Sequence, residues 1–178
     1  MQILGIDCGS NATGYGIITS DGRRNERISS GVIRPRKGQP MPERLRHISS
    51  ELRKLITSHQ LDAVAVEGIF FSVNARSALI LGQVRGVALL MAAEAGLSIH
   101  EYSPLQVKSS VVGYGQAEKA QVQEMVKVLL RLDHHPPEDA ADALAVAICH
   151  SHHCLPLARA ATAALAVPRS RRSQTFRT

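Results

Sequence analysis

Short apolar runs, bounded by glycines and turn residues, predict five β-strands. The Asp21-Gly22 pair between the second and third runs is a hairpin signal, so the first three strands are expected to form an antiparallel meander. The fourth run, Ala63–Glu67, is apolar up to its last residue, which is typical of a strand covered on both faces. The predicted strands are residues 1–7, 13–19, 28–33, 63–67 and 99–102.

Apolar residues at helical spacing predict helices between and after the later strands. Leu45, Ile48 and Leu52 line one face of the first helix. A strand, a crossover helix and a second buried strand form a parallel unit with a right-handed connection. Ser103 followed by Pro104 is a helix cap with proline at the first helical position. Helices are expected at residues 42–59, 74–95, from 103, 118–132 and 138–150, which makes the chain α/β.

The positive charge of the chain is concentrated at its C-terminal end. A length of 178 residues with 44% hydrophobic composition suits one globular domain, expected over residues 1–154. In that region the basic side chains exceed the acids by one, whereas residues 155–178 contain five arginines and no acid. This basic tail is expected to be flexible, and it either holds a polyanion loosely or is only a solvated end.

Composition also indicates the compartment. No apolar run is expected to be long enough to span a membrane, and the N-terminus lacks the layout of a signal peptide. Cys8, Cys149 and Cys154 are too few and too unevenly placed for a disulfide framework, which fits a reducing compartment. A cytoplasmic protein is therefore expected.

Four acids stand at the ends of buried elements. Asp7 and Glu67 each close an apolar strand, and Asp139 and Asp142 lie in the first turn of the last predicted helix. Ligands gather beyond the carboxyl ends of the strands in an open α/β sheet, and acids three residues apart share a helix face. An acid beside a buried run is costly unless something neutralises its charge. A shared cation site is therefore predicted.

The chemistry of such a site follows from its oxygen ligands, which select hard cations such as Mg²⁺. Two such ions activate water and stabilise the leaving oxygen in phosphodiester cleavage. Ordinary structural roles are also open to single acids: Asp7 can bond turn amides, and Asp139 can complement the helix dipole. Glu67 is the hardest to explain in this way, because it directly follows a fully apolar strand.

The predicted helix over residues 74–95 is unusual in its second half. From Val84 onward it is apolar on nearly every side except at Arg85 and Glu94. A helix of this kind must be covered all round. The sheet can cover one side, and a second copy of the chain is the simplest cover for the other.

Four stretches of the chain, in their order and spacing, resemble the Holliday-junction resolvases of the RuvC type, which are bacterial endonucleases with the ribonuclease H-like fold. The resemblance covers about residues 2–153. The stretches are Leu4-Gly5-Ile6-Asp7-x-Gly-Ser with Thr13-Gly14-Tyr15-Gly16; Val66-Glu67 with Phe70, Asn74, Ser77-Ala78 and Leu81-Gly82-Gln83; Val111-Val112-Gly113-Tyr114-Gly115-Gln116-Ala117-Glu118-Lys119 with Gln121-Val122; and Asp139-Ala140-Ala141-Asp142-Ala143-Leu144-Ala145.

The resemblance implies a mixed five-stranded sheet, an antiparallel meander plus parallel strands, flanked by helices. It implies a homodimer that nicks two strands of like polarity in a four-way DNA junction during recombination and repair, leaving 5′-phosphate and 3′-hydroxyl ends. It also implies partners of the RuvA and RuvB branch-migration types. The implied catalytic ligands of two Mg²⁺ ions, with Mn²⁺ as a substitute, are Asp7, Glu67, Asp139 and Asp142.

The resemblance also implies contacts to DNA. Lys108 and Lys119 match basic residues that approach phosphates near the scissile bond, and Phe70 matches an aromatic that stacks on junction bases. Stacking on an aromatic ring is worth ~1–3 kcal/mol per base. The chain departs from the family pattern at Cys8, where proline is usual, and at Gly68, where glutamine is frequent. Neither is one of the acids, although Gly68 bears on the contacts that order the Phe70 loop.

The segment from Cys149 to Cys154 contains zinc-ligand residue types. Structural zinc sites usually use two spaced pairs of ligands, so cationic histidines at a helix C-terminus are the expected role here.

Three other functions deserve weighing against resolution of junctions. An ATPase of the actin/hexokinase type is suggested by Asp7-x-Gly-Ser, but the chain lacks the second lobe that such proteins need. A junction-binding scaffold without catalysis is disfavoured by the presence of all four acids. A related ribonuclease H-like nuclease that acts on other branched or RNA-containing substrates is an alternative that the acid cluster alone does not distinguish.

Overall fold

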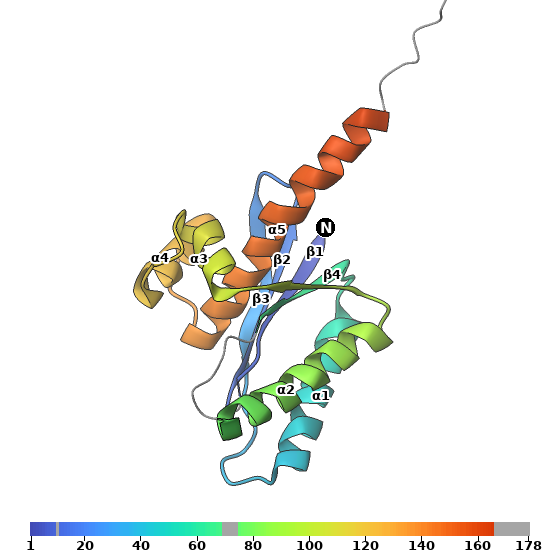
Figure 1. Ribbon diagram of the computed structural model, residues 1–178, viewed down its shortest axis with the longest axis vertical. Helices are drawn as coiled ribbons and strands as arrows, with labels where there is room; N and C mark the ends of the chain where they lie inside the picture. The colour runs from blue at the N-terminus through green and yellow to red at the C-terminus, as the bar shows by residue number, and fades with distance from the viewer. Residues whose placement is uncertain (10, 69–74, 166–178) are drawn as a thin grey trace, which may run out of the picture.

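The computed structural model describes the backbone of residues 1–9, 11–68 and 75–165, and side chains up to residue 154 within those ranges. Its centre is a five-stranded sheet in the order β3-β2-β1-β4-β5 (Figure 1). The first three strands are antiparallel, and β4 and β5 extend the sheet parallel to β1. The strands are β1 (Gln2–Asp7), β2 (Thr13–Ser20), β3 (Asn25–Ile33), β4 (Ala63–Glu67) and β5 (Ser98–Tyr102).

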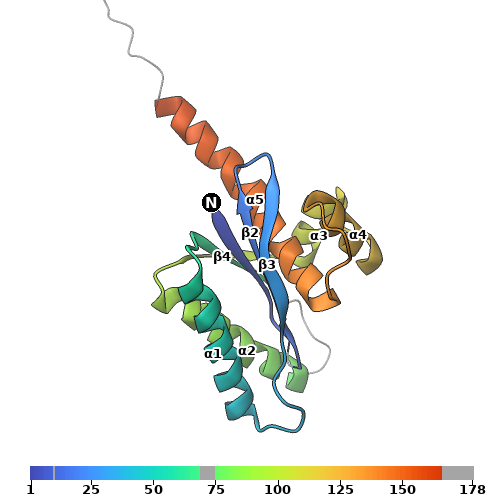
Figure 2. The same cartoon turned by 180° about the vertical axis from the view of Figure 1, so that it is seen from behind.

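Helices cover both faces of the sheet. Two of them share a core with Leu4, Ile6 and Val66 on one face, and the other three pack against Ile3 and Ala65 on the opposite face (Figures 1 and 2). The two cores follow from the alternation of side chains along each strand. The first pair is α1 (Met41–Ser58) and α2 (Ala75–Glu94), and the second group is α3 (Pro104–Val112), α4 (Lys119–Leu129) and α5 (Glu138–Leu165).

Local signals determine several of these elements as the sequence predicted. Asp21 Oδ1 accepts hydrogen bonds from the amides of Arg23 and Arg24, which closes the β2–β3 hairpin. The Ser103 side chain accepts from the Gln106 amide in a capping box that begins α3, with Pro104 at the first helical position. Gly113 ends α3 with a φ of 97°, a left-handed conformation that suits glycine.

The last helix is much longer than predicted. The helix is expected to end near His150, because histidines suit the C-terminus of a helix. In the structure α5 instead continues to Leu165. Alanine is frequent between residues 158 and 165, and it is the residue with the strongest helix propensity. The alanine-rich residues 158–165, whose composition allows a helix, therefore continue α5 instead of belonging to a flexible tail.

Helix α2 is long and apolar enough to cross a membrane by length and composition, so the expectation that no run reaches this length was wrong. The core helix of a water-soluble protein meets the same criterion. In the structure α2 packs against α1 and β5 and contributes Val84, Ala88 and Met91 to a buried core.

Candidate active site

The strand ends bring Asp7 and Glu67 to one edge of the sheet. Strands β1 and β4 are parallel neighbours with Ile6 opposite Val66, so the acid that follows each lies at the same level. Ile3 and Ala65 face the α5 side of the sheet, and the two-residue period puts Asp7 and Glu67 on that side as well. The two predicted acids are thus placed on the face that α5 covers.

Glycines allow α5 to lie unusually close to the sheet. Gly14 pairs with Asp7 across the β1–β2 ladder, and a Cβ atom on Gly14 would lie 1.8 Å from the Asp139 carbonyl oxygen. A Cβ on Gly5 would lie 2.0 Å from the Ala143 carbonyl oxygen. Only a residue without a side chain fits at such separations. The first turn of α5 therefore rests on β1 and β2 beside Asp7.

The charges of the four acids act on one another. Burial has the largest effect on the Asp7 carboxyl, and together with the carboxylates of Asp142, Glu67 and Asp139, in that order of effect, it raises the pKa of Asp7 from 3.8 to about 7. Burial and Asp142 also raise the pKa of Glu67, while Lys119 and Lys108 oppose this shift. The structure thus brings together the acids that the sequence singled out. A bound cation would relieve the mutual repulsion of these carboxylates.

Lys119 forms ion pairs with two acids of α5. Its Nζ lies 2.9 Å from Asp142 Oδ2 and 2.6 Å from Glu138 Oε1. Burial alone would lower the pKa of Lys119, but the two carboxylates outweigh burial and raise it. Glu138 was not among the predicted site residues, because an acid in the first turn of a helix has an ordinary role with the helix dipole.

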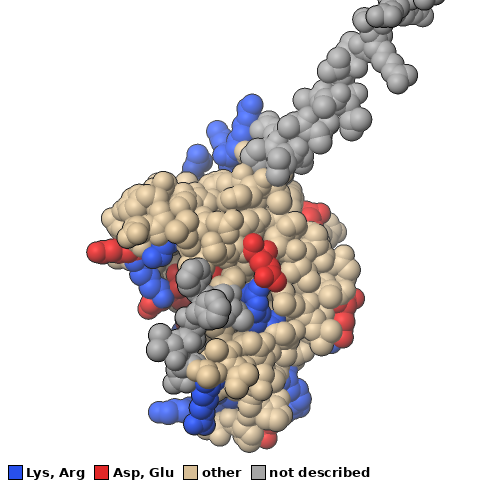
Figure 3. Space-filling model, in the orientation of Figure 1, with Lys and Arg blue, Asp and Glu red and all other residues tan. Residues whose placement is uncertain are grey.

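A cavity of about 210 Å³ opens beside the acids. Two acids and two lysines that the sequence singled out line it, so it presents both signs of charge. On the face in Figure 3, acidic and basic atoms lie close together below the region of α3 and α4. The lining residues are Glu67, Pro104, Val107, Lys108, Lys119, Val122, Asp142 and Ala145.

Arg85 lies on α2 and reaches the end of β4 from the face of the sheet opposite α5. It is 7% exposed, and its guanidinium donates to the Glu67 carbonyl oxygen and lies 2.7 Å from Glu101 Oε2. Sequence reasoning noted Arg85 only as a charge in an apolar helix. A lone arginine among residues with a buried pattern was the available signal, since buried charges require partners.

Asp139 makes an ion pair with Arg34 at 3.4 Å, so this acid, like Asp142 with Lys119, has a cationic partner within the described chain. Phe70, the predicted base-stacking residue, and the Asn74 cap lie outside the described residues.

Comparison with known proteins identifies the family. The family model for crossover junction endodeoxyribonuclease RuvC matches residues 3–150. The chain belongs to the RuvC family. A RuvC from Citrifermentans bemidjiense is 52% identical over 152 residues, covering 85% of this chain and 93% of that protein. A RuvC from Koribacter versatilis is 52% identical over 161 residues, covering 89% and 97%.

A solved structure supports the same assignment. The T. thermophilus RuvC in complex with a Holliday junction substrate superposes with a TM-score of 0.83 and 32% identity, covering 88% of this chain and 96% of that one. The ribonuclease H-like fold expected from the sequence is therefore confirmed. RuvC-type nucleases depend on divalent metal ions, and membership in a nuclease family sets aside the ATPase alternative.

Proposed function

We propose that this protein resolves four-way DNA junctions by metal-dependent hydrolysis of phosphodiester bonds, in the cytoplasm, during recombination and repair. The observation that carries the proposal is the convergence of Asp7, Glu67, Asp139 and Asp142 at one edge of the sheet, with two lysines at the adjoining cavity. The complex of the T. thermophilus relative with a Holliday junction substrate supports the choice of DNA.

The four acids are the ligands in this proposal. Their oxygens suit Mg²⁺, with Mn²⁺ as a substitute, and two bound ions would supply an activated water and stabilise the leaving oxygen. Asp7 lies in the field of the three other acids, so it is the group whose negative charge most needs a cation. Products with 5′-phosphate and 3′-hydroxyl ends are proposed.

The lysines orient the DNA phosphate. Lys108 and Lys119 line the same cavity as Glu67 and Asp142, so a phosphate there would meet cationic and metal-bound groups together. An incoming phosphate would also compete with Asp142 and Glu138 for Lys119, which now bonds both carboxylates. Phe70 is proposed to stack on a base at the junction, in keeping with the family pattern.

Helix α2 is proposed as the contact of a homodimer. Leu79 and Leu90 are 71% and 53% exposed on the same side of α2 as Gly82 and Gly86. A Cβ on either glycine would meet no atom within 4 Å, so this side of the helix is open to a second backbone. A two-fold dimer fixes two active sites relative to each other, which suits two matched nicks in a junction. Branch-migration proteins of the RuvA and RuvB types are the proposed partners.

A nicking assay on a synthetic four-way junction with Mg²⁺ tests the function, with Asp7→Asn as the variant. We expect the variant to bind the junction but not to cut it. Asp62→Asn is the matched control: Asp62 lies at the opposite end of β4, where Oδ2 accepts from the Gln2 amide, and asparagine keeps an acceptor. Cleavage that survives in Asp7→Asn would refute the site.

Substrate choice needs a separate arm of the assay. The wild-type protein is compared on a four-way junction, on a linear duplex of the same sequence and on a branched substrate with RNA in one strand. Paired nicks on the junction alone support resolution. Equal cutting of the RNA-containing substrate would instead favour a related ribonuclease H-like nuclease, and it would not count against the proposed metal site.

A further inference from the structure

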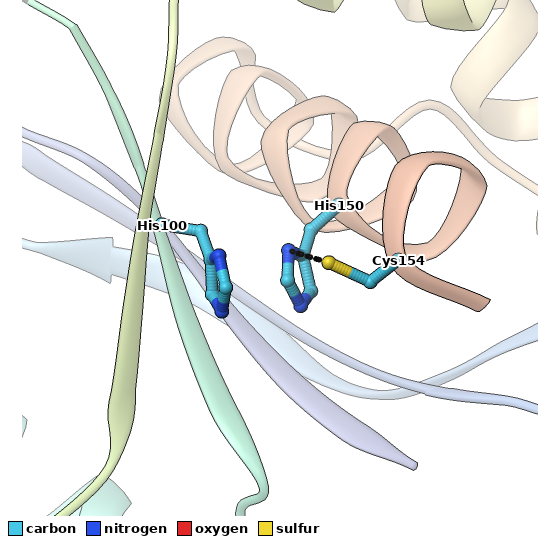
Figure 4. Close-up of side chains that lie close together, drawn as sticks. All are labelled: His100, His150 and Cys154. Carbon is cyan, nitrogen blue, oxygen red and sulfur yellow. Dashed lines mark hydrogen bonds between the residues drawn. The ribbon is translucent and has the colours of Figure 1, made fainter. Parts of the chain in front are cut away.

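A second group of metal-ligating side chains lies away from the four acids. His100 comes from β5, and His150 and Cys154 come from successive turns of α5 (Figure 4). One ligand atom from each of the three lies within 4.8 Å of the other two. The His100 and His150 rings have centroids 4.3 Å apart, and the Cys154 Sγ lies 3.5 Å from His150 Nδ1.

The fold explains why these residues meet. Positions four apart share one face of a helix, so His150 and Cys154 point the same way from α5. On β5, His100 and Tyr102 are two residues apart and so point to the same face of the sheet, and the Tyr102 hydroxyl also reaches His150. Eight residues separate Asp142 from His150, which corresponds to roughly 12 Å along the helix at 1.5 Å per residue. The cluster is therefore distinct from the carboxylate site.

His150 is the buried centre of the cluster. It is fully buried, its Nδ1 lies 2.8 Å from the Tyr102 hydroxyl, and its Nε2 has no hydrogen-bond partner within the described part of the chain. Burial, with smaller effects from His100 and His153, lowers the pKa of His150 to about 4. The ring is thus neutral at physiological pH, the form that binds metals. A buried nitrogen without a partner is costly, and a bound cation removes that cost.

We propose that His100, His150 and Cys154 bind one transition-metal ion of the zinc class, which fastens the edge strand β5 to α5. Two imidazoles and a thiolate favour zinc, cobalt or nickel over the hard ions that suit carboxylates. Zinc lies about 2.0–2.1 Å from nitrogen and about 2.3 Å from sulfur, so tetrahedral neighbours stand roughly 3.5 Å apart. The ligand atoms of the three residues lie within 4.8 Å of one another, so small side-chain rotations would bring His100, Cys154 and the free Nε2 of His150 to this separation, with a water as the fourth ligand.

The site differs from the one that the sequence suggested. Within the segment from Cys149 to Cys154, the two other histidines already have hydrogen-bond partners: His152 Nδ1 meets the Ser110 hydroxyl, and His153 Nδ1 meets the Cys149 carbonyl oxygen. The third ligand, His100, lies about fifty positions upstream, and spacing within one segment gave no sign of it. The expectation of cationic histidines at a helix C-terminus does not hold for His150, which is buried in the middle of α5.

Cobalt binding to the full-length chain tests the proposal, after treatment with a chelator and in an Asp7→Asn background that weakens the carboxylate site. Co²⁺ bound through a thiolate gives a sulfur-to-cobalt charge-transfer band in the near ultraviolet. We expect one equivalent of Co²⁺ to produce this band, and one equivalent of Zn²⁺ to remove it and to raise the melting temperature. Cys154→Ser should lose the band, and His100→Ala should weaken binding at least tenfold.

Cys149→Ser is the matched control, because Cys149 is a buried thiol on the same helix outside the three ligands. It should keep the band. Absence of a thiolate band in the parent protein at stoichiometric Co²⁺ would overturn the proposal, as would a band that persists in Cys154→Ser. Circular dichroism of each variant checks that the fold is retained. Because the readout is a spectrum and not DNA cleavage, this result is independent of the proposed nuclease function.

Discussion

Gly14 touches the backbone of Asp139: a Cβ atom at position 14 would lie 1.8 Å from the Asp139 carbonyl oxygen. Gly14 is also the residue that pairs with Asp7 in the β1–β2 ladder. A strand residue and a helix residue more than one hundred positions apart thus set how closely the acids of α5 approach Asp7. The acid cluster therefore depends on the absence of a side chain at Gly14 as much as on the carboxylates themselves.

Replacing Gly14 with alanine should displace the first turn of α5. Overpacking of this kind typically costs about 1–3 kcal/mol, and misplacement of catalytic groups by about 1 Å can reduce a rate by roughly 100-fold. We expect lower stability in urea unfolding and at least a 100-fold loss of junction cleavage. Gly68→Ala is the control for stability, since its Cβ would approach the nearest backbone atom no closer than 3.4 Å. Equal losses of stability in both variants would contradict the close approach of α5.

The raised pKa of Asp7 predicts a pH-dependent stability in the metal-free protein. Burial and neighbouring acids raise this pKa from 3.8 to about 7, so between these values the folded state holds a proton that the unfolded chain has released. The Asp7 carboxyl therefore destabilises the fold increasingly as the pH rises through this window. Asp7→Asn should be more stable than wild type by on the order of 2 kcal/mol at about pH 8, and hardly different near pH 4.

Urea unfolding in the presence of a chelator, at both pH values, measures this difference. Asp62→Asn serves again as the control. A gain in stability for Asp7→Asn that is the same at both pH values would show that folding does not raise the pKa of Asp7. Binding of divalent ions should weaken as the pH falls below about 7, because protons compete with the metal for Asp7.

Arg85→Met should destabilise the protein and slow cleavage. The substitution leaves the Glu67 carbonyl oxygen without its guanidinium donor, and an unsatisfied buried group costs about 1–3 kcal/mol. The matched control is Arg53→Met, which removes an exposed pair with Glu94 at 3.2 Å and should cost less than about 1 kcal/mol. Thermal melts and nicking rates of the two variants provide the comparison. Similar losses would mean that burial of Arg85 has no special role.

Leu90→Glu should dissociate the proposed dimer. Leu90 is 53% exposed in the single chain, and a charge there would be buried at an α2–α2 contact. Sedimentation velocity over a concentration series measures the association. Val128→Glu is the control, because Val128 is 56% exposed on α4, away from the proposed contact. A dimer of unchanged affinity in Leu90→Glu would place the interface elsewhere.

Sequence patterns were sufficient for the strand ends. The apolar run before Glu67 predicted a buried parallel strand, and the structure places Glu67 beside Asp7 because β1 and β4 are neighbours. Spacing of three residues put Asp139 and Asp142 in one helical turn for the same local reason. Such features are predictable since they depend on periodicity within one element.

Contacts between elements were not predictable in this way. The bonds of Arg85 to Glu67 and Glu101 join α2 to β4 and β5, and the pairing of His100 with His150 joins β5 to α5. Neither follows from spacing along the chain. The end of α5 was missed for a different reason, because the histidine-rich segment imitates a helix terminus while the alanines beyond it continue the helix.

Helix α5 carries Asp139 and Asp142 at one end, and His150 and Cys154 about two and three turns further on. Each residue advances an α-helix by about 100°, so inserting or deleting a single residue between Asp142 and His150 would swing one of these groups away from the sheet. Because Gly5 and Gly14 hold the backbone of α5 close against the sheet, the helix has little freedom to rotate and restore the lost alignment. This segment should therefore tolerate exchanges of side chains far better than any change in its length.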